Sequence, residues 1–296
     1  MTSDKIKHTY KDAVFSMLFY TDQYAKRNLA ELCNALHPEE EIKEEDIQLV
    51  RLEQILLIGM YNDSAFMIKD RRIVLVEQQA SLNWNMPLRM LLYLAREYEQ
   101  LFPAEYRFKR AQIRLPRPEF ITFYNGMDDF PQEQIMRLSD AFRMEDGKEQ
   151  PQLELTARMI NINREKGHSI LTKCPVLGQY SELVFRIKQQ KTRDRAALER
   201  IIKECIAENI LRDFLERHSS EVINMLDAEY NYEEDIRVQR GEAWEEGREE
   251  GREEGREEGA LGMLISLVQK GLLSIKDAAE QAGISEIAFQ QKMGLK

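Results

Sequence analysis

The chain has few of the residues that build disulfide frameworks or zinc sites. Its 296 residues include three cysteines, Cys33, Cys174 and Cys205, which are odd in number and widely spaced. Such a set forms neither a disulfide framework nor a zinc knuckle, so a reducing cytoplasm is the simplest location. The four histidines show no HxxxH-type pairing and therefore indicate no zinc site.

Long hydrophobic runs are also missing. No apolar run reaches the roughly 18 residues that a membrane-spanning helix needs. The N-terminal residues 1–12 lack the apolar segment of a signal peptide. We therefore expect a cytoplasmic protein that does not associate with membranes. A composition of 43% hydrophobic and 32% charged residues is globular, and the length suggests one or two domains.

An excess of positive charge is the third absence, because the formal net charge is −10. Much of this negative charge lies in one segment: residues 241–260 contain nine Glu and three Arg, which contribute −6 of the total. The rest of the chain is close to neutral. A near-neutral body with local basic patches can bind phosphate backbones, so the net charge does not exclude nucleic acid as a partner.

Hydrophobic periodicity predicts helices that alternate with short buried strands in the first part of the chain. Helices are expected over 8–37 and 87–102, and strands over 47–52, 64–68, 72–79, 119–126 and 152–162. From 176 to 240 the pattern is helical throughout. This order predicts an α/β fold with a helical C-terminal extension. The expected division is a core over 1–175, a helical extension over 176–240, a repeat over 241–260 and a small helical tail over 261–296.

Residues 245–259 repeat the pattern EEGR, with a glycine every fourth residue. Glycine costs about 1 kcal/mol in a helix interior, so one interpretation is a solvated, partly helical linker. The other is a self-association helix whose glycine stripe lets two backbones approach, which predicts a homo-oligomer. The tail segment 275–291 resembles a small helix-turn-helix, although simple helical hairpins share its pattern.

Polar side chains end the most hydrophobic strand of the chain. The apolar run 73–76 is followed by Glu77, Gln78 and Gln79. Because side chains alternate along a strand, Glu77 and Gln79 are predicted on one face and Gln78 on the other. Asp63 lies fourteen residues before Glu77, next to the apolar run 64–68.

The register of these two runs decides whether Asp63 and Glu77 meet. A three-residue loop centred on Asp70 makes residue 68 face residue 72 and makes Asp63 face Glu77. A two-residue loop shifts the register by one and turns Asp63 away.

Two carboxylates brought together repel each other and resist desolvation. A hard divalent ion such as Mg²⁺ resolves this conflict, since it takes carboxylate and carbonyl oxygens and retains waters. Asp63, Glu77 and the backbone carbonyl of Gln78 are therefore the candidate metal ligands. In the alternative interpretation, both acids mark exposed strand ends and pair with Lys69, Arg71 or Arg72.

The pattern of Asp63 followed by Glu77-x-Gln79 at the end of a buried strand resembles the motif of the PD-(D/E)XK nuclease superfamily. The longer blocks "HTYKDAVFSMLF", "YNDSAF", "VEQQASLNWNMPLRMLLY" and "LPRPEFITFYNG" are similar to those of the recombination-promoting nuclease family, also labelled PD-(D/E)XK nuclease family transposases. The similarity covers roughly residues 8–240, and the Gly-Glu-Arg repeat also fits this family.

The resemblance implies a restriction-endonuclease-like core and DNA cleavage that depends on Mg²⁺ or Mn²⁺, with little sequence specificity and a link to recombination or DNA mobility in bacteria. Asp63 and Glu77 would be metal ligands, and Gln79 would take the position of the motif's lysine. Glutamine only hydrogen-bonds, whereas lysine offers a positive charge. The alternative is a catalytically degenerate nuclease fold that binds DNA or a protein without cutting.

Asp12, Asn85 and Arg89 are additional candidates. A further carboxylate from the first core helix is frequent in the superfamily, and Asp12 matches it, although it can equally cap that helix or form a salt bridge. Asn85 and Arg89 follow the motif and are placed to reach a phosphate, but Arg89 can equally pair with Glu97 or another surface acid.

Two further features have both a functional and a structural interpretation. Trp84 is either a wedge against DNA or a packed anchor of its loop. The basic run from Arg186 to Arg195 either lines a phosphate-binding surface or is a solvated helix end.

Overall fold

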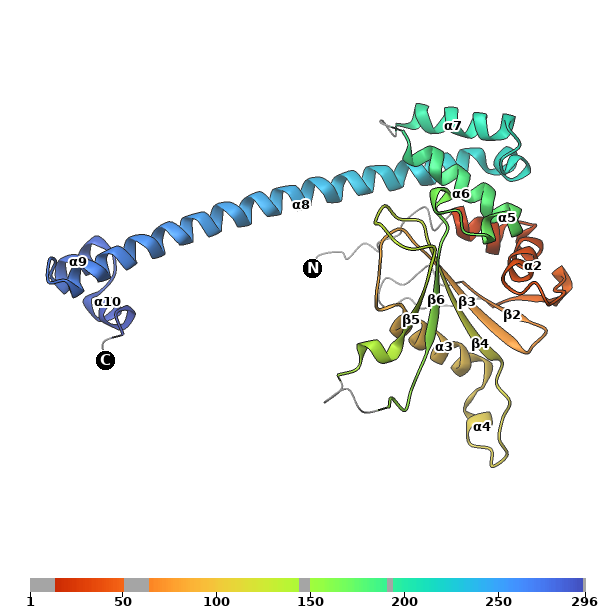
Figure 1. Cartoon of the computed structure of the whole chain (residues 1–296), viewed down its shortest axis with the longest axis horizontal. Coiled ribbons are helices and arrows are strands. Elements are labelled where there is room, and N and C mark those ends of the chain that lie inside the picture. The colour runs from red at the N-terminus through yellow and green to blue at the C-terminus, as the bar shows by residue number, and fades with distance from the viewer. Residues whose placement is uncertain (1–13, 51–63, 144–149, 191–193, 295–296) are drawn as a thin grey trace. The chain divides into compact units, whose positions relative to one another are not determined.

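The computed structural model describes residues 14–50, 64–143, 150–190 and 194–294 (Figure 1). Two compact units divide the chain, one within Met1–Tyr230 and the other within Asn231–Lys296. The first unit contains a mixed sheet flanked by helices, and the second is helical. The predicted α/β fold with a helical C-terminal region is confirmed at this level.

Six strands form one sheet in the order β1-β2-β3-β4-β6-β5. Their bounds are Ile47–Val50 (β1), Ser64–Ile68 (β2), Arg72–Gln79 (β3), Arg117–Tyr124 (β4), Glu133–Arg137 (β5) and Thr156–Asn161 (β6). β3 pairs in parallel with β4, and β4 in parallel with β6, whereas the other neighbours are antiparallel. The parallel pairs form the centre of the sheet; helices lie in the connection from β3 to β4, whereas β5 lies in the connection from β4 to β6.

The β2–β3 hairpin has the predicted three-residue loop. Ile68 faces Arg72, and the pairing continues to Ser64 opposite Val76. Lys69 and Asp70 both have positive φ, at 50° and 52°, and this left-handed backbone closes the tight reversal. The predicted register is therefore confirmed over the described residues. Asp63 itself, like Asp12, lies outside them.

Helices cover both faces of the sheet. On one face, α3 (Met86–Leu101) packs its buried residues Met86, Met90 and Tyr93 against Ile73 and Leu75 of β3. The helix begins at the predicted place, with Pro87 in its first turn, where the missing N–H costs nothing. On the other face, Val74 and Val76 belong to a core shared with α2 (Ala25–Leu36) and α6 (Pro175–Lys188). β3 is thus buried on both faces, as predicted.

The helix predicted over 8–37 is not continuous in its described part. A short π-helical segment, Met17–Thr21, ends at Asp22, whose backbone is extended, and α2 starts again at Ala25. The carboxylate of Asp22 accepts a hydrogen bond of 2.9 Å from the Tyr24 N–H and also pairs with Arg217. The sequence does not reveal this break, because the apolar residues keep helical spacing on both sides of it. The hydrogen bond between the Asp22 side chain and the backbone leaves that apolar pattern unchanged.

The predicted elements do not include β5, α4, the short helix α5 (Ile170–Lys173) or the 3-10 turns. β5 is a short edge strand whose sequence EQIMR is mostly polar, and Arg158 of β6 pairs with its Glu133 at 2.6 Å. The short helix α4 (Ala104–Arg107) lies in the connection between α3 and β4. The strands predicted over 119–126 and 152–162 correspond to β4 and β6.

The helical region begins with α5 (Ile170–Lys173), α6, α7 (Arg195–Ala207) and α8 (Arg212–Gln269). The EEGR repeat lies within α8, so it is helical, and its described side chains are exposed. α9 (Ile275–Gln281) and α10 (Glu286–Lys292) follow, each capped by a serine hydroxyl, and Phe289 is fully buried between them and the end of α8. Within the described residues, no helix is both long and apolar enough to cross a bilayer.

Candidate functional site

The carboxyl-terminal ends of β3, β4 and β6 meet at one edge of the sheet. Their last residues are Gln79, Tyr124 and Asn161. The register pairs Glu77 with Thr122 and Gln79 with Tyr124, so the polar end of β3 lies beside β4. In open α/β sheets, ligands bind outside the carboxyl ends of parallel strands. We call this region the β3 edge.

Glu77 is a buried carboxylate on the α3 face of the β3 edge. Its side chain is 3% exposed, and Nη2 of Arg89 lies 2.6 Å from its Oε1. The side-chain amide of Gln79 donates a hydrogen bond to the same oxygen. Nε of Arg89 also donates to the hydroxyl of Tyr93 at 3.0 Å. The predicted convergence of Glu77 and Gln79 on one face is therefore confirmed, and Arg89 joins them.

Thr122 adds an oxygen on the same face. Its register partner is Glu77, its neighbours Phe120 and Tyr124 belong to the core on the α3 side, and its side chain is fully buried. Among the described residues, its hydroxyl has no hydrogen-bond partner. A buried hydroxyl without a partner is costly, so Thr122 joins Glu77 and Gln79 as a candidate polar group on this face.

A second polar group occupies the opposite face of the β3 edge. The Nε2 of Gln78 donates to Oδ1 of Asn125 at 2.6 Å, and Nδ2 of Asn125 is 3.3 Å from the hydroxyl of Tyr180 on α6. Gln78 thus points away from Glu77, as predicted. The sequence marked Asn125 only as part of a turn, since "YNG" is a turn signal.

Lys188, in the last turn of α6, reaches the same edge. Its Nζ donates to Oδ1 of Asn163 at 2.8 Å and to the backbone carbonyl of Asn125. Nδ2 of Asn163 in turn donates to the carbonyl of Gly126 at 3.0 Å. Nothing in the sequence separated Lys188 from the neighbouring solvated charges, because its inward direction depends on how α6 packs.

The predicted site residues are distributed as follows. Glu77, Gln79 and Arg89 lie together, and Gln78 lies across the sheet from them. The suggested pair of Arg89 with Glu97 is wrong, since Arg89 pairs with Glu77. Asn85 is exposed and precedes α3 as its N-terminal cap residue.

The alternative that Glu77 is an exposed strand end is also wrong. Glu77 is buried, while Lys69 pairs with Asp46 and Arg72 pairs with Glu40 and Glu119. The positive partner of Glu77 comes from α3.

The donors at the β3 edge match a hard divalent ion in kind. The Glu77 carboxylate and the partnerless Thr122 hydroxyl are oxygen donors, which Mg²⁺ and Mn²⁺ prefer. The Arg89 guanidinium, however, already neutralises Glu77. A divalent ion therefore requires a second carboxylate at this edge, and Asp63 is the residue that the sequence supplies for it.

One group of possible metal ligands lies elsewhere. Single ligand atoms of His37, Glu39 and Glu40 lie within 4.8 Å of one another. Glu40, however, pairs with Arg72, and the Nε2 of His37 is 2.8 Å from Glu119. Because Arg72 and His37 already hold Glu40 and Glu119, we interpret the group as an ion-pair and hydrogen-bond network. Arg72 begins β3 and lies about 17 Å from Glu77 at roughly 3.3 Å per residue, so the two groups are separate.

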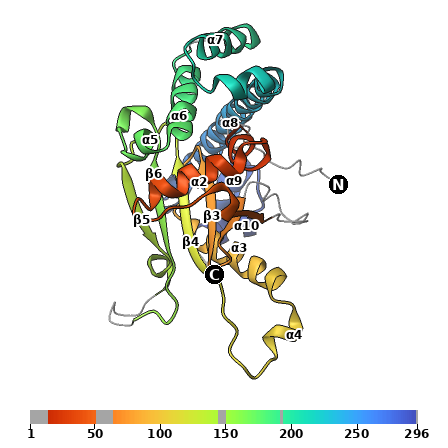
Figure 2. The same cartoon turned by 90° about the vertical axis from the view of Figure 1, so that its right-hand side faces the viewer.

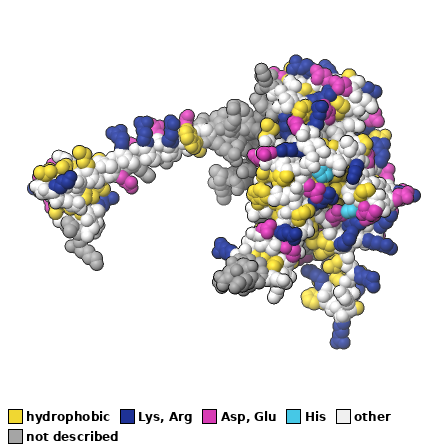
Figure 3. Space-filling view, in the orientation of Figure 1, with side chains coloured by type: hydrophobic (Ala, Val, Ile, Leu, Met, Phe, Trp, Pro, Cys, Tyr) yellow, Lys and Arg dark blue, Asp and Glu magenta, His cyan; other side chains and the backbone are white. Residues whose placement is uncertain are grey.

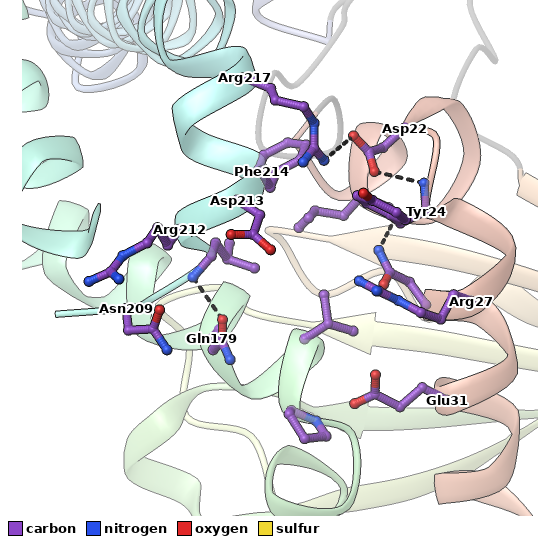
Figure 4. A pocket seen from close by; sticks show the side chains of 15 residues that line it. Asp22, Tyr24, Arg27, Glu31, Gln179, Asn209, Arg212, Asp213, Phe214 and Arg217 are labelled. Carbon is purple, nitrogen blue, oxygen red and sulfur yellow. Dashed lines mark hydrogen bonds and ion pairs between the residues drawn. The ribbon is translucent and has the colours of Figure 1, made fainter. Parts of the chain in front are cut away.

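A cavity of about 270 Å³ lies between α2, the start of α6 and the start of α8 (Figure 4). In its wall, Asp22 pairs with Arg217 at 2.7 Å, and the guanidinium groups of Arg27 and Arg217 lie 4.4 and 4.9 Å from the centre of the Tyr24 ring. Burial raises the pKa of Glu31 in this cavity. The charges of Asp22, Arg217 and Arg27 are thus engaged within the wall.

Trp84 and the basic run from Arg186 to Arg195 both make structural contacts, so the functional interpretation alone does not describe them. Trp84 is 60% exposed, and its ring lies 6.5 Å from that of Phe130, so it both contacts its surroundings and presents a surface beside the β3 edge. Arg186 pairs with Glu182 and Glu208, and Arg195 pairs with Glu199. These two charges of the predicted phosphate-binding run are therefore balanced by acids.

No protein-family model matches the chain, and neither the search of curated proteins nor that of solved structures gave a match.

Proposed function

We propose that the chain is a metal-dependent DNA endonuclease with a restriction-endonuclease-like core, which hydrolyses phosphodiester bonds with little sequence specificity and takes part in recombination or DNA mobility. One observation carries this proposal. A buried carboxylate, Glu77, ends the central strand β3, and Gln79 and Arg89 both contact its Oε1. The resemblance to PD-(D/E)XK nucleases names the same strand end.

Energetic cost supports a functional interpretation of Glu77. Burying a carboxylate is expensive unless it is paired and hydrogen-bonded, and a hydrophobic side chain at this position would avoid the expense. The following residue on that face, Gln79, is also polar, and Thr122 beside it has a hydroxyl without a partner in the described part of the chain. Polar groups concentrated at the carboxyl end of a buried strand are typical of a ligand site.

In the proposed site, Asp63, Glu77 and the backbone carbonyl of Gln78 hold Mg²⁺ or Mn²⁺. The ion supplies an activated water and stabilises the charge that develops on the phosphodiester. Gln79 orients the Glu77 carboxylate through its amide hydrogen bond. Arg89 exchanges its ion pair with Glu77 for the phosphate, because a guanidinium binds both groups in a bidentate manner.

The second candidate is a degenerate nuclease fold that binds DNA or a protein without cutting. Two observations favour it. Gln79 cannot supply the positive charge of the motif's lysine, and Arg89 neutralises Glu77, which lowers the affinity of this edge for a cation.

Cleavage of supercoiled plasmid during titration with Mg²⁺ and Mn²⁺ tests the proposal. The wild type, Asp63→Asn and Glu77→Gln are compared, with Glu216→Gln as a control because Glu216 is an exposed acid on α8, away from the basic arm. We expect metal-dependent nicking or cutting by the wild type and the control, suppressed by EDTA and by both site variants. Equal background cleavage by all four proteins contradicts the endonuclease. DNA binding without products under any metal condition favours the second candidate.

A further inference from the structure

The connection between α3 and β4 is strongly basic. Residues 103–117 contain five Lys or Arg and one Glu, a net charge of +4 in a chain whose total is −10. We call this segment the basic arm. It extends away from the sheet in both views, with the short helix α4 near its tip (Figures 1 and 2). Lys and Arg side chains project from it, among hydrophobic and other side chains, in the space-filling view (Figure 3).

The basic arm also presents apolar side chains to solvent. All residues from Pro103 to Gln112 are exposed, and Phe108 is 87% exposed, more than any other large hydrophobic residue of the described chain. Tyr106 is 45% exposed. With Leu115, which is 48% exposed, these side chains place three exposed apolar groups among the basic residues of one short segment.

The base of the arm is held in place. The hydroxyl of Tyr98 donates to the carbonyl of Pro116 at 2.6 Å, and the N–H of Arg117 donates to the carbonyl of Arg71 at 2.8 Å. Phe102 packs edge-on against both Tyr98 and Tyr106, with ring centres 6.2 and 6.5 Å apart. These contacts fix where the arm leaves the body.

Among the described residues, the basic side chains near the tip of the arm form no strong ion pair. Arg107 pairs with Glu99 at 3.6 Å, but both side chains are at least half exposed, so this pair is weak. Lys109 lies 4.0 Å from the centre of the Tyr106 ring. Within the described ranges, no acidic side chain pairs with Lys109, Arg110 or Arg114.

We propose that the basic arm binds the phosphate backbone of duplex DNA, with Phe108 contacting the groove beside it. The proposal rests on the proposed function for its choice of partner, but it does not depend on cleavage. A local excess of Lys and Arg on an otherwise acidic chain is the electrostatic footprint of nucleic-acid binding. The arm lacks the extended apolar face of a membrane-surface helix, which argues against a lipid partner.

The arm leaves the sheet at the opposite end of β4 from the β3 edge. Arg117 begins β4 at the base of the arm, and Tyr124 ends it at the β3 edge. At roughly 3.3 Å per residue this strand separates the two by about 23 Å. Substitutions in the arm therefore test DNA binding without touching the residues of the β3 edge.

Binding of a short fluorescent duplex, measured by anisotropy in EDTA over roughly 50 to 200 mM salt, tests the arm without cleavage. The variant Lys109→Gln/Arg110→Gln is compared with Arg200→Gln/Lys203→Gln, which removes two exposed basic residues from α7. Each lost phosphate contact reduces the slope of log affinity against log salt by about 0.9. We expect a reduction approaching 1.8 for the arm variant, and a smaller one for the control.

Phe108→Ala separates the apolar contact from the charge. It is expected to weaken binding while leaving the salt slope unchanged, because no phosphate contact is lost. Equal effects of the arm and control variants, or unchanged binding by both arm variants, overturn the proposal. So does arm-dependent binding of anionic phosphatidylserine vesicles with no binding of DNA.

The assay also separates this inference from the nuclease proposal. If the wild type shows no cleavage under any metal condition but DNA binding still depends on the arm, only the endonuclease is lost. If cleavage depends on Glu77 but binding does not depend on the arm, only the arm is lost.

Discussion

Nη2 of Arg89 lies 2.6 Å from Oε1 of Glu77, which joins the first turns of α3 to the carboxyl end of β3. Glu77 is 3% exposed and Arg89 is 28% exposed, so solvent screens the charge of Arg89 but hardly that of Glu77. The two residues thus tie the helix that follows the strand to a buried position near the strand's carboxyl end. The contact serves stability and the proposed site at the same time.

Arg89→Ala is expected to lower the free energy of unfolding by about 2 kcal/mol, because it removes the guanidinium beside a buried carboxylate. Arg89→Lys restores the charge without the planar fork, so its effect should be smaller. Urea unfolding followed by Trp84 fluorescence measures both, in a background where Trp244, the other tryptophan of the chain, is replaced by Phe.

A double-mutant cycle with Glu77→Gln checks that the effect belongs to this pair. Residues in direct contact show coupling of about 0.5–3 kcal/mol. Additive effects of Arg89→Ala and Glu77→Gln contradict the assigned pair.

The β2–β3 hairpin could be predicted from the sequence because each strand is a short apolar run and only three residues separate them. The length of that loop set the register of Ile68 opposite Arg72. β5 could not be predicted from the sequence, since its five residues are mostly polar and it is stabilised by its pairing with β6. The break at Asp22 depends on Arg217, which is far away in the sequence and cannot be inferred from local pattern.

The site was predictable only where residues follow one another along a strand. Alternation placed Glu77 and Gln79 on one face and Gln78 on the other. Lys188 was missed because its position depends on the packing of α6. Glu97 is near Arg89 in the sequence and was therefore an expected partner, but the two residues are eight positions apart on the helix. α3 packs back along β3, which brings Arg89 to Glu77 instead.

Glu97 predicts a pH dependence of stability. It is fully buried on α3, and its carboxylate has no hydrogen-bond partner among the described residues. Burial raises its pKa from 4.5 to about 6. The folded state therefore binds the proton more tightly than the unfolded state, and stability falls as the pH rises from 4.5 through about 6. Glu97→Gln should remove this loss, which is about 2 kcal/mol at pH 7.

Glu99→Gln is the matched control for Glu97, because it lies on the same helix with its side chain 66% exposed. Urea unfolding at several pH values between 4.5 and 7.5 should show a flatter profile for Glu97→Gln alone. Identical pH profiles for Glu97→Gln and the wild type refute the assignment.

Gly126 marks close packing at the β3 edge. A Cβ at this position would meet the backbone carbonyl of Ala80 and the ring of Tyr124. Because the carbonyl cannot rotate away, Gly126→Ala is expected to lower the free energy of unfolding by about 1–3 kcal/mol. Gly247→Ala is the control, since no described atom lies within 4 Å of a Cβ built there; it should instead increase helix stability by about 1 kcal/mol. Circular dichroism during thermal unfolding distinguishes the two, and similar effects would argue against the packing explanation.

Asp22 predicts the opposite pH behaviour to Glu97. Burial acts to raise its pKa, but hydrogen bonds from Arg217, the Tyr24 N–H and His218 outweigh burial, so the pKa lies below the ordinary value of 3.8. The carboxylate thus contributes stability that is present above pH 3.8 and is lost as the pH falls through the lowered pKa. Asp22→Asn should cost about 2 kcal/mol at pH 7, and this difference from the wild type should shrink at acid pH. Asp213→Asn, an exposed acid of the same cavity, should show little change. Urea unfolding at pH 7 and pH 3 measures both variants, and a cost of Asp22→Asn that stays constant between the two pH values shows that the charge of Asp22 is not what stabilises the break before α2.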